Sequence, residues 1–364
     1  MSDPQLDGDL PTEARNPRTL GIDEVGTLDL LTIINREDVT VAQAVAACLP
    51  VLAEVVDIAA ERMRAGGRIH YVGAGTSGRL AVLDAAELEP TFSLEPGRVV
   101  AHQAGGTEAL TNAIEGAEDR AEEGAAAAAT VVADDLVIGL AASGRTPFVR
   151  AALETAAANG AATVLVSSNP QAPIAAVADW HICVDTGPEV VAGSTRMKAG
   201  TAQKLVLNAF STAVMVRLGK TYSNLMVDLH ATNDKLRART LTILHEATGA
   251  DEAACRQALH AADDDLKTAL VMLRSGLAPG PARAALDRNG GNARQALHEL
   301  GASTDPGTPT DPGPPTDPGT PTDPSTPTEP GTPTDPSAPT EPGPPTAPGT
   351  PTSPAVNARD DGEG

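Results

Sequence analysis

Five short runs rich in valine and isoleucine alternate with longer segments of helical pattern in this chain. The runs cover residues 68–72, 98–102, 135–140, 162–167 and 181–185. Short apolar strands that alternate with helices are typical of a parallel sheet covered by helices on both faces. The sequence therefore predicts an α/β domain, to which we assign residues 54–245.

The segments that flank this domain have different patterns. Residues 1–53 predict an N-terminal helical arm, and a long helical hairpin is expected before the sheet, with residues 40–63 as its principal helix. Residues 246–300 predict a small helical module whose helices end at glycines. Its helices are expected over residues 251–261, 266–275 and 281–300.

Residues 301–364 consist largely of a repeated unit, Thr-Asp/Glu-Pro-Gly/Ser-x-Pro. Because this repeat offers no apolar side chains for a core, we expect a disordered and extended Pro-rich tail. Acidic residues recur every six positions from Asp305 on. Docking of the tail to a partner is therefore the alternative to a tail without a ligand.

Two glycine-rich loops with hydroxyl side chains follow two of the predicted strands. The first loop covers residues 73–79 and the second loop covers residues 142–147. Each stands between a strand and a segment that can be helical, where backbone N–H groups and hydroxyls can bind an anion. Two such loops predict a phosphorylated molecule held between them.

The first loop also fits the dinucleotide-binding pattern, with Gly73, Gly75 and Gly78 at the glycine positions. That interpretation requires an acidic residue at the end of the next strand, to bind the ribose. The next run ends in His102 and Gln103 and offers no carboxylate. A phosphate-binding loop is therefore favoured over a nicotinamide cofactor site.

The charge of the chain limits the partners that it can attract. The formal net charge is −22 over 364 residues, and a field of this sign repels polyanions and anionic membranes. The chain also has few aromatic residues, on which single-stranded nucleic acids stack. We expect no nucleic acid and no membrane as partners, and any bound phosphate must be held by local geometry.

Metal-binding and targeting patterns are missing from the sequence. Cys48, Cys183 and Cys255 lie far apart, and the histidines show no zinc-type spacing. We therefore expect neither a metal nor a cofactor. The first residues do not form a signal peptide, and no uncharged apolar run reaches about 18 residues. The cytoplasm is the expected location.

Seven motifs together resemble one family, the N-acetylmuramic acid 6-phosphate etherases. The resemblance covers residues 12 to about 300, and the proline-rich tail falls outside it. The motifs are residues 12–17, 73–80, 84–87, 115–119, 142–147, 189–204 and 224–228, with a further match at 231–235.

The resemblance implies a fold, an activity and an assembly. The fold is a sugar isomerase (SIS) domain with a flavodoxin-like parallel sheet, followed by a helical module similar to ubiquitin-associated (UBA) domains. The family removes D-lactate from N-acetylmuramic acid 6-phosphate and gives N-acetylglucosamine 6-phosphate in the recycling of cell-wall sugars. Its members are typically homodimers. A small phosphosugar and a second copy of the chain are thus the expected partners.

The resemblance also implies two catalytic carboxylates, Glu87 and Glu118. Opening of the sugar ring gives an aldehyde at C1, so a base can remove the C2 proton while an acid protonates the lactyl oxygen on C3. We assign Glu87 as the acid and Glu118 as its partner at C2 or at the water. Without the resemblance, the sequence would favour a different interpretation, in which both glutamates are ordinary solvated carboxylates on helices.

The expected binding residues donate hydrogen bonds to phosphate or to sugar hydroxyls. They are Ser143, Gly144, Arg145 and Thr146 in the second loop, Gly75, Thr76 and Ser77 in the first loop, and Ser194, Thr195 and Lys198 in a further polar turn. We call residues 194–198 the third turn. For this turn, substrate contact and packing across a dimer are both left open.

Two other classes of function remain alternatives. A non-catalytic sugar-phosphate sensor, similar to the glucokinase regulatory proteins, would need a second phosphosugar-binding domain, for which the chain is too short. An aldose-ketose isomerase would share the removal of the C2 proton. It would not need an acid at a C3 ether, so the motif around Glu87 argues against it.

Overall fold

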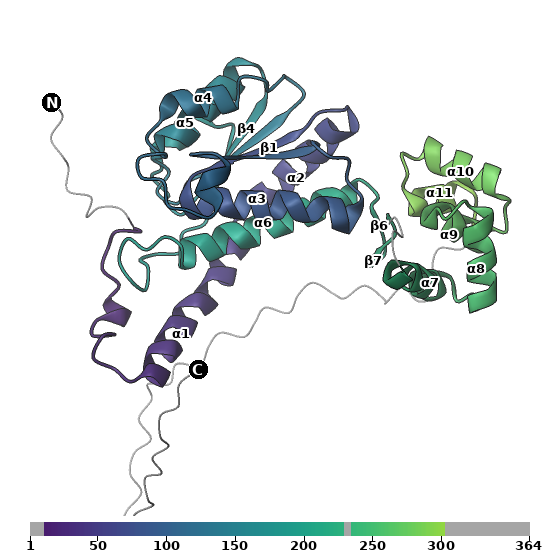
Figure 1. Ribbon diagram of the computed structural model, residues 1–364, viewed down its shortest axis with the longest axis horizontal. Helices are drawn as coiled ribbons and strands as arrows, with labels where there is room; N and C mark the ends of the chain where they lie inside the picture. Colours follow the sequence, from purple (N-terminus) through teal and green to yellow (C-terminus); the bar gives the residue numbers. More distant parts are fainter. Residues whose placement is uncertain (1–10, 229–233, 303–364) are drawn as a thin grey trace, which may run out of the picture. The chain divides into compact units, whose positions relative to one another are not determined.

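The computed structural model of the protein describes residues 11–228 and 234–302 (Figure 1). The predicted tail from residue 303 on lies outside the described residues, as do residues 1–10 and 229–233.

The centre of the fold is a parallel sheet of five strands in the order β2-β1-β3-β4-β5. The strands are β1 (Ile69–Gly73), β2 (Val99–Gln103), β3 (Leu136–Leu140), β4 (Ala162–Ser167) and β5 (Trp180–Cys183). This is the flavodoxin-like order, so the predicted α/β class and its doubly covered parallel sheet are confirmed. The observed strands lie within about two residues of the predicted ones.

The register brings the carboxyl ends of neighbouring strands to one edge of the sheet. Gly73 at the end of β1 stands opposite Gln103 in β2 and opposite Leu140 in β3. Strand β2, which follows β1 in the chain, pairs with one edge of β1, and β3 pairs with its other edge. Ligands of such sheets bind at this switch point, and here the first and second loops leave the sheet side by side.

Helices cover both faces of the sheet (Figure 1). They are α2 (Leu49–Arg64), α3 (Gly75–Phe92) and α6 (Lys198–Arg217) on one face, and α4 (Ala121–Ala127) and α5 (Pro147–Ala158) on the other. Side chains of β3 alternate between the two faces, so that Ile138 packs with the first group and Val137 with the second. Because both faces are covered, every residue of β1, β3 and β4 is buried.

The predicted single helix over residues 40–63 is wrong. The structure has two helices, α1 (Thr27–Ala46) and α2, with an angle of 60° between them. Pro50 lies in the first turn of α2, and its ring has no N–H to donate to Ala46, four residues earlier. No single helix in the described part of the chain is long and apolar enough to span a membrane, although this bent pair passes that test by length and composition.

The chain continues beyond α6 in a short hairpin and a group of helices. They are β6 (Thr221–Tyr222), β7 (Leu225–Met226), α7 (Asp234–Thr248), α8 (Glu252–Ala261), α9 (Leu266–Ser275), α10 (Pro279–Arg288) and α11 (Ala293–Glu299). They share a separate apolar core. The helix expected over 281–300 is two helices, because Gly290 and Gly291 interrupt it. The likeness to UBA domains and the domain boundaries stay predictions.

Three short 3-10 helices complete the described elements. They are η2 (Pro17–Thr19), η3 (Thr107–Leu110) and η4 (Pro173–Val177).

Candidate active site

The first loop opens helix α3 directly after the central strand β1. The residue before the helix, Ala74, provides no side-chain cap, and helix geometry leaves the first backbone N–H groups without acceptors inside the helix. These N–H groups belong to Gly75, Thr76 and Ser77, which are exposed or half-buried. The predicted phosphate-binding residues of the first loop therefore present a cluster of donors at the edge of the sheet.

Gly78 allows the start of α3 to approach the end of β1. A Cβ atom at this position would lie 2.6 Å from the carbonyl oxygen of Gly73 and 1.8 Å from Oε1 of Gln103. The glycine spacing that resembles a dinucleotide motif thus has a packing reason in this chain. It brings the N-terminal turn of α3 within contact of the strand ends.

The second loop is fixed by contacts to the segment after β4. Asn169 donates from Nδ2 to the carbonyl oxygen of Ser143 at 2.9 Å, and the Ile174 N–H donates to the carbonyl oxygen of Gly144 at 3.2 Å. Gly144 has a φ of +66°. Thr146 precedes α5, and its side chain makes no capping hydrogen bond. Ser143 and Thr146 are half-buried, so both hydroxyls stand at the edge of the sheet where a ligand can reach them.

A cavity of about 230 Å³ lies beside the first loop. Glu118 and Gly75 both line this cavity. The backbone carbonyl oxygen of Glu118 accepts a hydrogen bond from the Phe148 N–H at 3.0 Å. Arg79 also lines the cavity and donates to the carbonyl oxygens of Leu110 and Asn112. The structure therefore brings the predicted carboxylate Glu118 to the first loop and links it to the start of α5.

Gln103 is a candidate binding residue that sequence reasoning missed. Its Oε1 is buried and has no hydrogen-bond partner among the residues that the structure describes. The side chain lines the same cavity and lies against Gly78. An unsatisfied buried acceptor is costly unless a ligand or water satisfies it. The position of Gln103 at the end of the strand next to β1 is the signal that could have found it.

Glu87, the other predicted carboxylate, lies further along α3. It is exposed and does not line the cavity. It stands ten residues after Ser77, which is about 15 Å along a helix axis, and helical side chains lean back toward the N-terminus. Glu87 and the start of the first loop's helix therefore both belong to α3. Glu118 lies elsewhere, in the turns before α4.

Asp84, one turn before Glu87, is buried and holds α3 against its neighbours. It accepts hydrogen bonds from Tyr71 Oη and from Ser211 Oγ, each at 3.0 Å. Burial raises the pKa of Asp84 to about 6, although both hydroxyl donors act to lower it. Because β1 and α6 both bond to this carboxyl group, it fixes the rotation of α3 and with it the direction of Glu87.

We expect the Asp84→Asn variant to change how stability depends on pH. A folded-state pKa of about 6 lies above the ordinary value of about 3.9. Ionisation therefore costs the wild type up to about 3 kcal/mol of stability as pH rises from 4 to 7, and this cost is absent below pH 4. Urea unfolding at pH 4, 5.5 and 7 measures it.

The free energy of unfolding of Asp84→Asn, relative to wild type, should rise steadily over this range. The exposed carboxylate variant Asp23→Asn is the matched control. Parallel pH profiles for wild type and Asp84→Asn would contradict the assignment.

The third turn lies against the first loop. The Gly200 N–H donates to the carbonyl oxygen of Thr195 at 2.9 Å, and a Cβ at Gly200 would be 3.3 Å from Cγ2 of Thr76. Ser194 and Thr195 are half-buried. Their predicted contact with substrate stays a prediction, and the structure brings them to the same edge as the first loop.

Lys198 has other partners than the substrate contact predicted for it. Its side chain is fully buried, and Nζ donates to Glu37 Oε2 and to the carbonyl oxygen of Pro188, each at 2.9 Å. Glu189 accepts from the backbone N–H groups of Lys198 and Ala199. Sequence reasoning missed both Glu37 and Glu189.

Residues 11–228 and 234–302 contain no group of three or more His, Cys, Asp or Glu side chains placed to hold a metal ion. Two histidines, His70 and His102, form a stacked pair, with Nδ1 of His70 and Nε2 of His102 3.1 Å apart. Burial lowers the pKa of His102 to about 4. The expectation of a site without metal stays a prediction.

Comparison with known proteins identifies the domain and its relatives. The model of the SIS domain matches residues 115–213, and that of the glucokinase regulatory protein N-terminal SIS domain matches residues 51–157. The N-acetylmuramic acid 6-phosphate etherase of Thermobifida fusca is 62% identical over 263 residues, which are 72% of this chain and 86% of the relative.

Relatives of the same name show that this match extends across bacteria. That of Pectobacterium atrosepticum is 51% identical over 80% of this chain and 96% of its own length, and that of Symbiobacterium thermophilum is 54% identical over 74% and 90%. The match to the Pectobacterium relative extends over 292 residues of this chain. With a SIS domain and with relatives of this identity covered over most of their length, the chain belongs to the N-acetylmuramic acid 6-phosphate etherase family.

Proposed function

We propose that this protein cleaves the D-lactyl ether of N-acetylmuramic acid 6-phosphate, releasing D-lactate and N-acetylglucosamine 6-phosphate. The observation that carries this proposal is the identity of 62% to an etherase of that name, 86% of whose length is covered. The geometry supports it, because two donor-rich loops and a carboxylate meet at the switch point of the sheet.

The proposed reaction is an elimination followed by hydration, which makes the enzyme a carbon-oxygen lyase. Ring opening exposes the C1 aldehyde, and Glu118 removes the proton from C2. The bond between C3 and the lactyl oxygen then breaks, and Glu87 donates a proton to the departing oxygen. Water adds to C3 of the resulting double bond, and a proton returns to C2. Each step needs one acid and one base.

The phosphate group is the proposed handle for the substrate. The hydroxyls of Ser143 and Thr146, the backbone N–H groups of Gly144 and Arg145, and the N-terminal turn of α3 would donate to its oxygens. Since the net charge of −22 repels a dianion at long range, these local donors must supply the binding energy. A phosphate fixed there would hold the sugar at a set distance from Glu118.

The alternatives have less support. The match to the glucokinase regulatory protein covers a single phosphosugar-binding domain, residues 51–157, whereas a sensor of that type would need two. An isomerase would leave the C3 ether intact and would not need an acid on α3.

One assay in labelled water tests the reaction. Purified protein is incubated with N-acetylmuramic acid 6-phosphate in deuterated water or in water enriched in oxygen-18. Elimination and hydration would place deuterium at C2 and the heavy oxygen at C3 of the sugar. Heavy oxygen in the lactate would indicate displacement by water at the lactyl carbon instead, and C2 exchange without lactate would favour the isomerase. No lactate from folded protein would contradict the etherase proposal.

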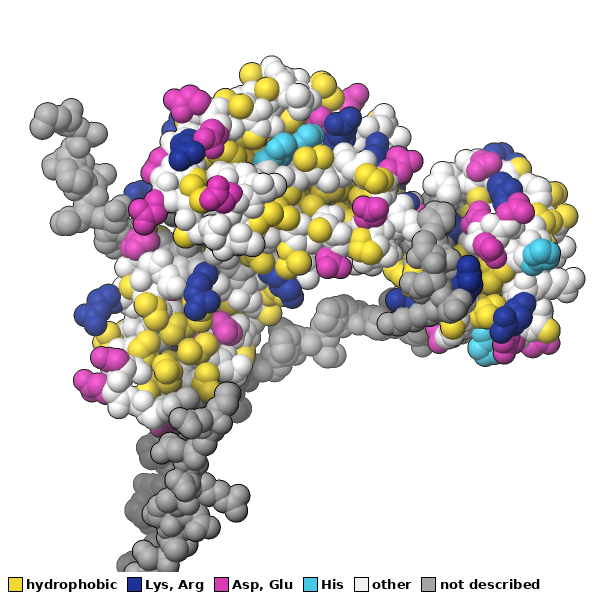
Figure 2. Space-filling model, in the orientation of Figure 1, with side chains coloured by type: hydrophobic (Ala, Val, Ile, Leu, Met, Phe, Trp, Pro, Cys, Tyr) yellow, Lys and Arg dark blue, Asp and Glu magenta, His cyan; other side chains and the backbone are white. Residues whose placement is uncertain are grey.

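We also propose that the protein acts as a homodimer. Helix α1 carries Leu28, Leu31 and Val39 on one face, exposed by 78%, 57% and 61%, and Figure 2 shows hydrophobic side chains gathered there. Leu83, one turn before Glu87 on α3, is 54% exposed. A second copy over α3 would shield Glu87 from water. Sedimentation equilibrium tests this, and a monomer at micromolar concentration would contradict it.

A further inference from the structure

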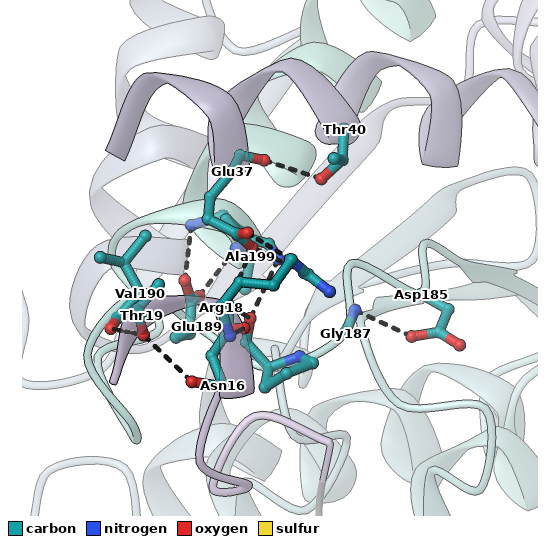
Figure 3. Close-up of polar contacts among 12 residues, drawn as sticks. Asn16, Arg18, Thr19, Glu37, Thr40, Asp185, Gly187, Glu189, Val190 and Ala199 are labelled. Atoms are coloured by element: carbon teal, nitrogen blue, oxygen red, sulfur yellow. Dashed lines mark hydrogen bonds and ion pairs between the residues drawn. The ribbon is translucent and has the colours of Figure 1, made fainter. Parts of the chain in front are cut away.

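A buried polar cluster joins the N-terminal segment, helix α1 and the start of helix α6 (Figure 3). Its members are Asn16, Thr19, Glu37, Glu189 and Lys198, and we call this set the clamp. All five are buried, with exposed fractions of 6% or less. Burial of charged groups is costly unless they are paired and hydrogen-bonded. A cluster of this kind therefore needs a reason beyond filling the core.

The pairing within the clamp satisfies its charges. Glu37 Oε2 accepts from Lys198 Nζ at 2.9 Å and from Asn16 Nδ2 at 2.8 Å. Arg18 forms an ion pair with the other oxygen of Glu37 at 2.5 Å. The hydrogen bond from Arg18, with those from Lys198 and Asn16, lowers the pKa of Glu37 to about 2. The carboxylate thus stays charged, and Lys198, Asn16 and Arg18 satisfy its oxygens.

Glu189 connects the cluster to the backbone of α6. Its two carboxylate oxygens accept from the N–H groups of Lys198 at 2.8 Å and Ala199 at 3.0 Å. These are the first two residues of the helix, where N–H groups have no acceptors inside the helix. The side chain of Glu189 therefore closes the segment 189–198 into a ring that contains the third turn.

The N-terminal segment holds this ring at three further points. Thr19 Oγ1 donates to the carbonyl oxygen of Val190 at 2.8 Å, and Asn16 Nδ2 donates to that of Pro188 at 3.4 Å. The Gly193 N–H donates to the carbonyl oxygen of Thr12 at 3.0 Å. These bonds hold the ring just before its start, at Val190 and at Gly193, and the pair of Lys198 with Glu37 holds its end.

The far side of the ring meets the first loop. The Thr195 carbonyl oxygen accepts from the Gly200 N–H, and Gly200 in turn lies against Thr76. A displacement of the ring would therefore move Ser194 and Thr195 relative to the donors at the start of α3. Shifts of about 1 Å at groups that hold a substrate can change rates by about a hundredfold.

We propose that Glu37, Glu189 and Lys198 are positioning residues, which fix Ser194 and Thr195 beside the first loop so that both contact the phosphosugar. This inference rests on the proposed function. None of the three residues touches substrate in it. They act through the backbone of the ring, so their loss should change the Michaelis constant (KM) and ligand binding more than turnover.

Three variants of the full chain test the clamp at graded strength. Lys198→Met and Glu37→Gln each remove one charge, and Thr19→Val removes the hydrogen bonds of one hydroxyl, to Asn16 and Val190, with little change of shape. We expect KM for N-acetylmuramic acid 6-phosphate to rise about tenfold for the first two and about threefold for the third, with kcat within threefold of wild type. Val55→Ala, a core change in α2 at a fully buried residue, is the control for lost stability.

The double variant Glu37→Gln/Lys198→Met separates positioning from stability. It leaves no unpaired charge between these two positions, so the unfolding midpoint should recover toward wild type. KM should stay raised, because the ring has lost its fastening. If KM instead recovers in step with the midpoint, or if Val55→Ala raises KM as much as the clamp variants do, the role is only structural and the inference fails.

A binding measurement separates this inference from the etherase proposal. Calorimetry with N-acetylglucosamine 6-phosphate needs no turnover. If wild type binds this sugar but releases no lactate, the etherase proposal fails, and the clamp is still judged by the dissociation constants of its variants. Equal constants for wild type and all folded variants would overturn the clamp. Weaker binding in the graded order, with normal lactate release by wild type, would support both.

Discussion

Replacement of Glu87 by glutamine should lower kcat for lactate release by about 10³-fold and leave KM within about threefold of wild type. Glutamine keeps the shape of the side chain but has no proton to give to the departing oxygen, and a general acid contributes about 10² to 10⁴ in rate. Substrate binding should persist because the phosphate donors are on other residues. Steady-state lactate release, measured on folded protein, gives both constants.

The matched control is Glu89→Gln, which removes an exposed carboxylate from the same helix two residues later. It should behave as wild type. Exchange of the C2 proton in deuterated water then separates the two glutamates. Glu87→Gln should still exchange this proton, whereas Glu118→Gln should not. If Glu87→Gln keeps kcat within tenfold of wild type, Glu87 is not the acid.

Gly144→Ala should damage both the stability of the protein and its hold on the phosphate. The residue has a φ of +66°, and a Cβ there would lie 2.2 Å from the Cβ of Ala172. An alanine in this left-handed conformation costs about 1–2 kcal/mol. Its overpacking against Ala172 costs about 1–3 kcal/mol more. Together these costs should lower Tm by about 10 °C. The second loop must move away from Ala172, so KM should rise at least about tenfold. Thermal unfolding and lactate kinetics measure these effects.

Two further variants decide the cause of this loss. Gly280→Ala lies in α10 with nothing within 4 Å and without a left-handed φ, so it should leave KM unchanged and should not lower Tm. Gly144→Ala/Ala172→Gly removes the closest contact and should recover part of the lost Tm, while the backbone strain remains. An unchanged KM in Gly144→Ala would mean that the second loop does not hold the phosphate.

The strands and loops of the sheet domain could be predicted because each leaves a local signal. Strands buried on both faces are continuous apolar runs, and the glycines of the first loop mark the close contact between α3 and β1. The break between α1 and α2 also has a local signal in Pro50. It was missed because the apolar pattern continues on both sides of the proline.

The clamp could not be predicted from spacing, because its partners are far apart in sequence. Glu37 and Lys198 are 161 residues apart, and no periodicity relates two such positions. One signal was available for Glu37. It stands at helical spacing from Val41 and Val45, both buried on α1, and a carboxylate on a buried stripe requires a buried partner. The cavity beside Glu118 likewise depends on how η3 and the following loop fold over β2.

The contacts of the N-terminal segment have a consequence for the order in which the protein assembles during synthesis. Asn16 and Pro188 are 172 residues apart, and Thr19 and Val190 are 171 apart. The first and second loops can form once β1, β3 and β4 have left the ribosome, but the N-terminal segment must wait for the start of α6. Because closing so long a loop costs entropy, it should dock last, onto a finished sheet. Residues 12–19 are thus made before the sheet but dock onto it only after the start of α6 has formed, and the third turn is not fixed until they do.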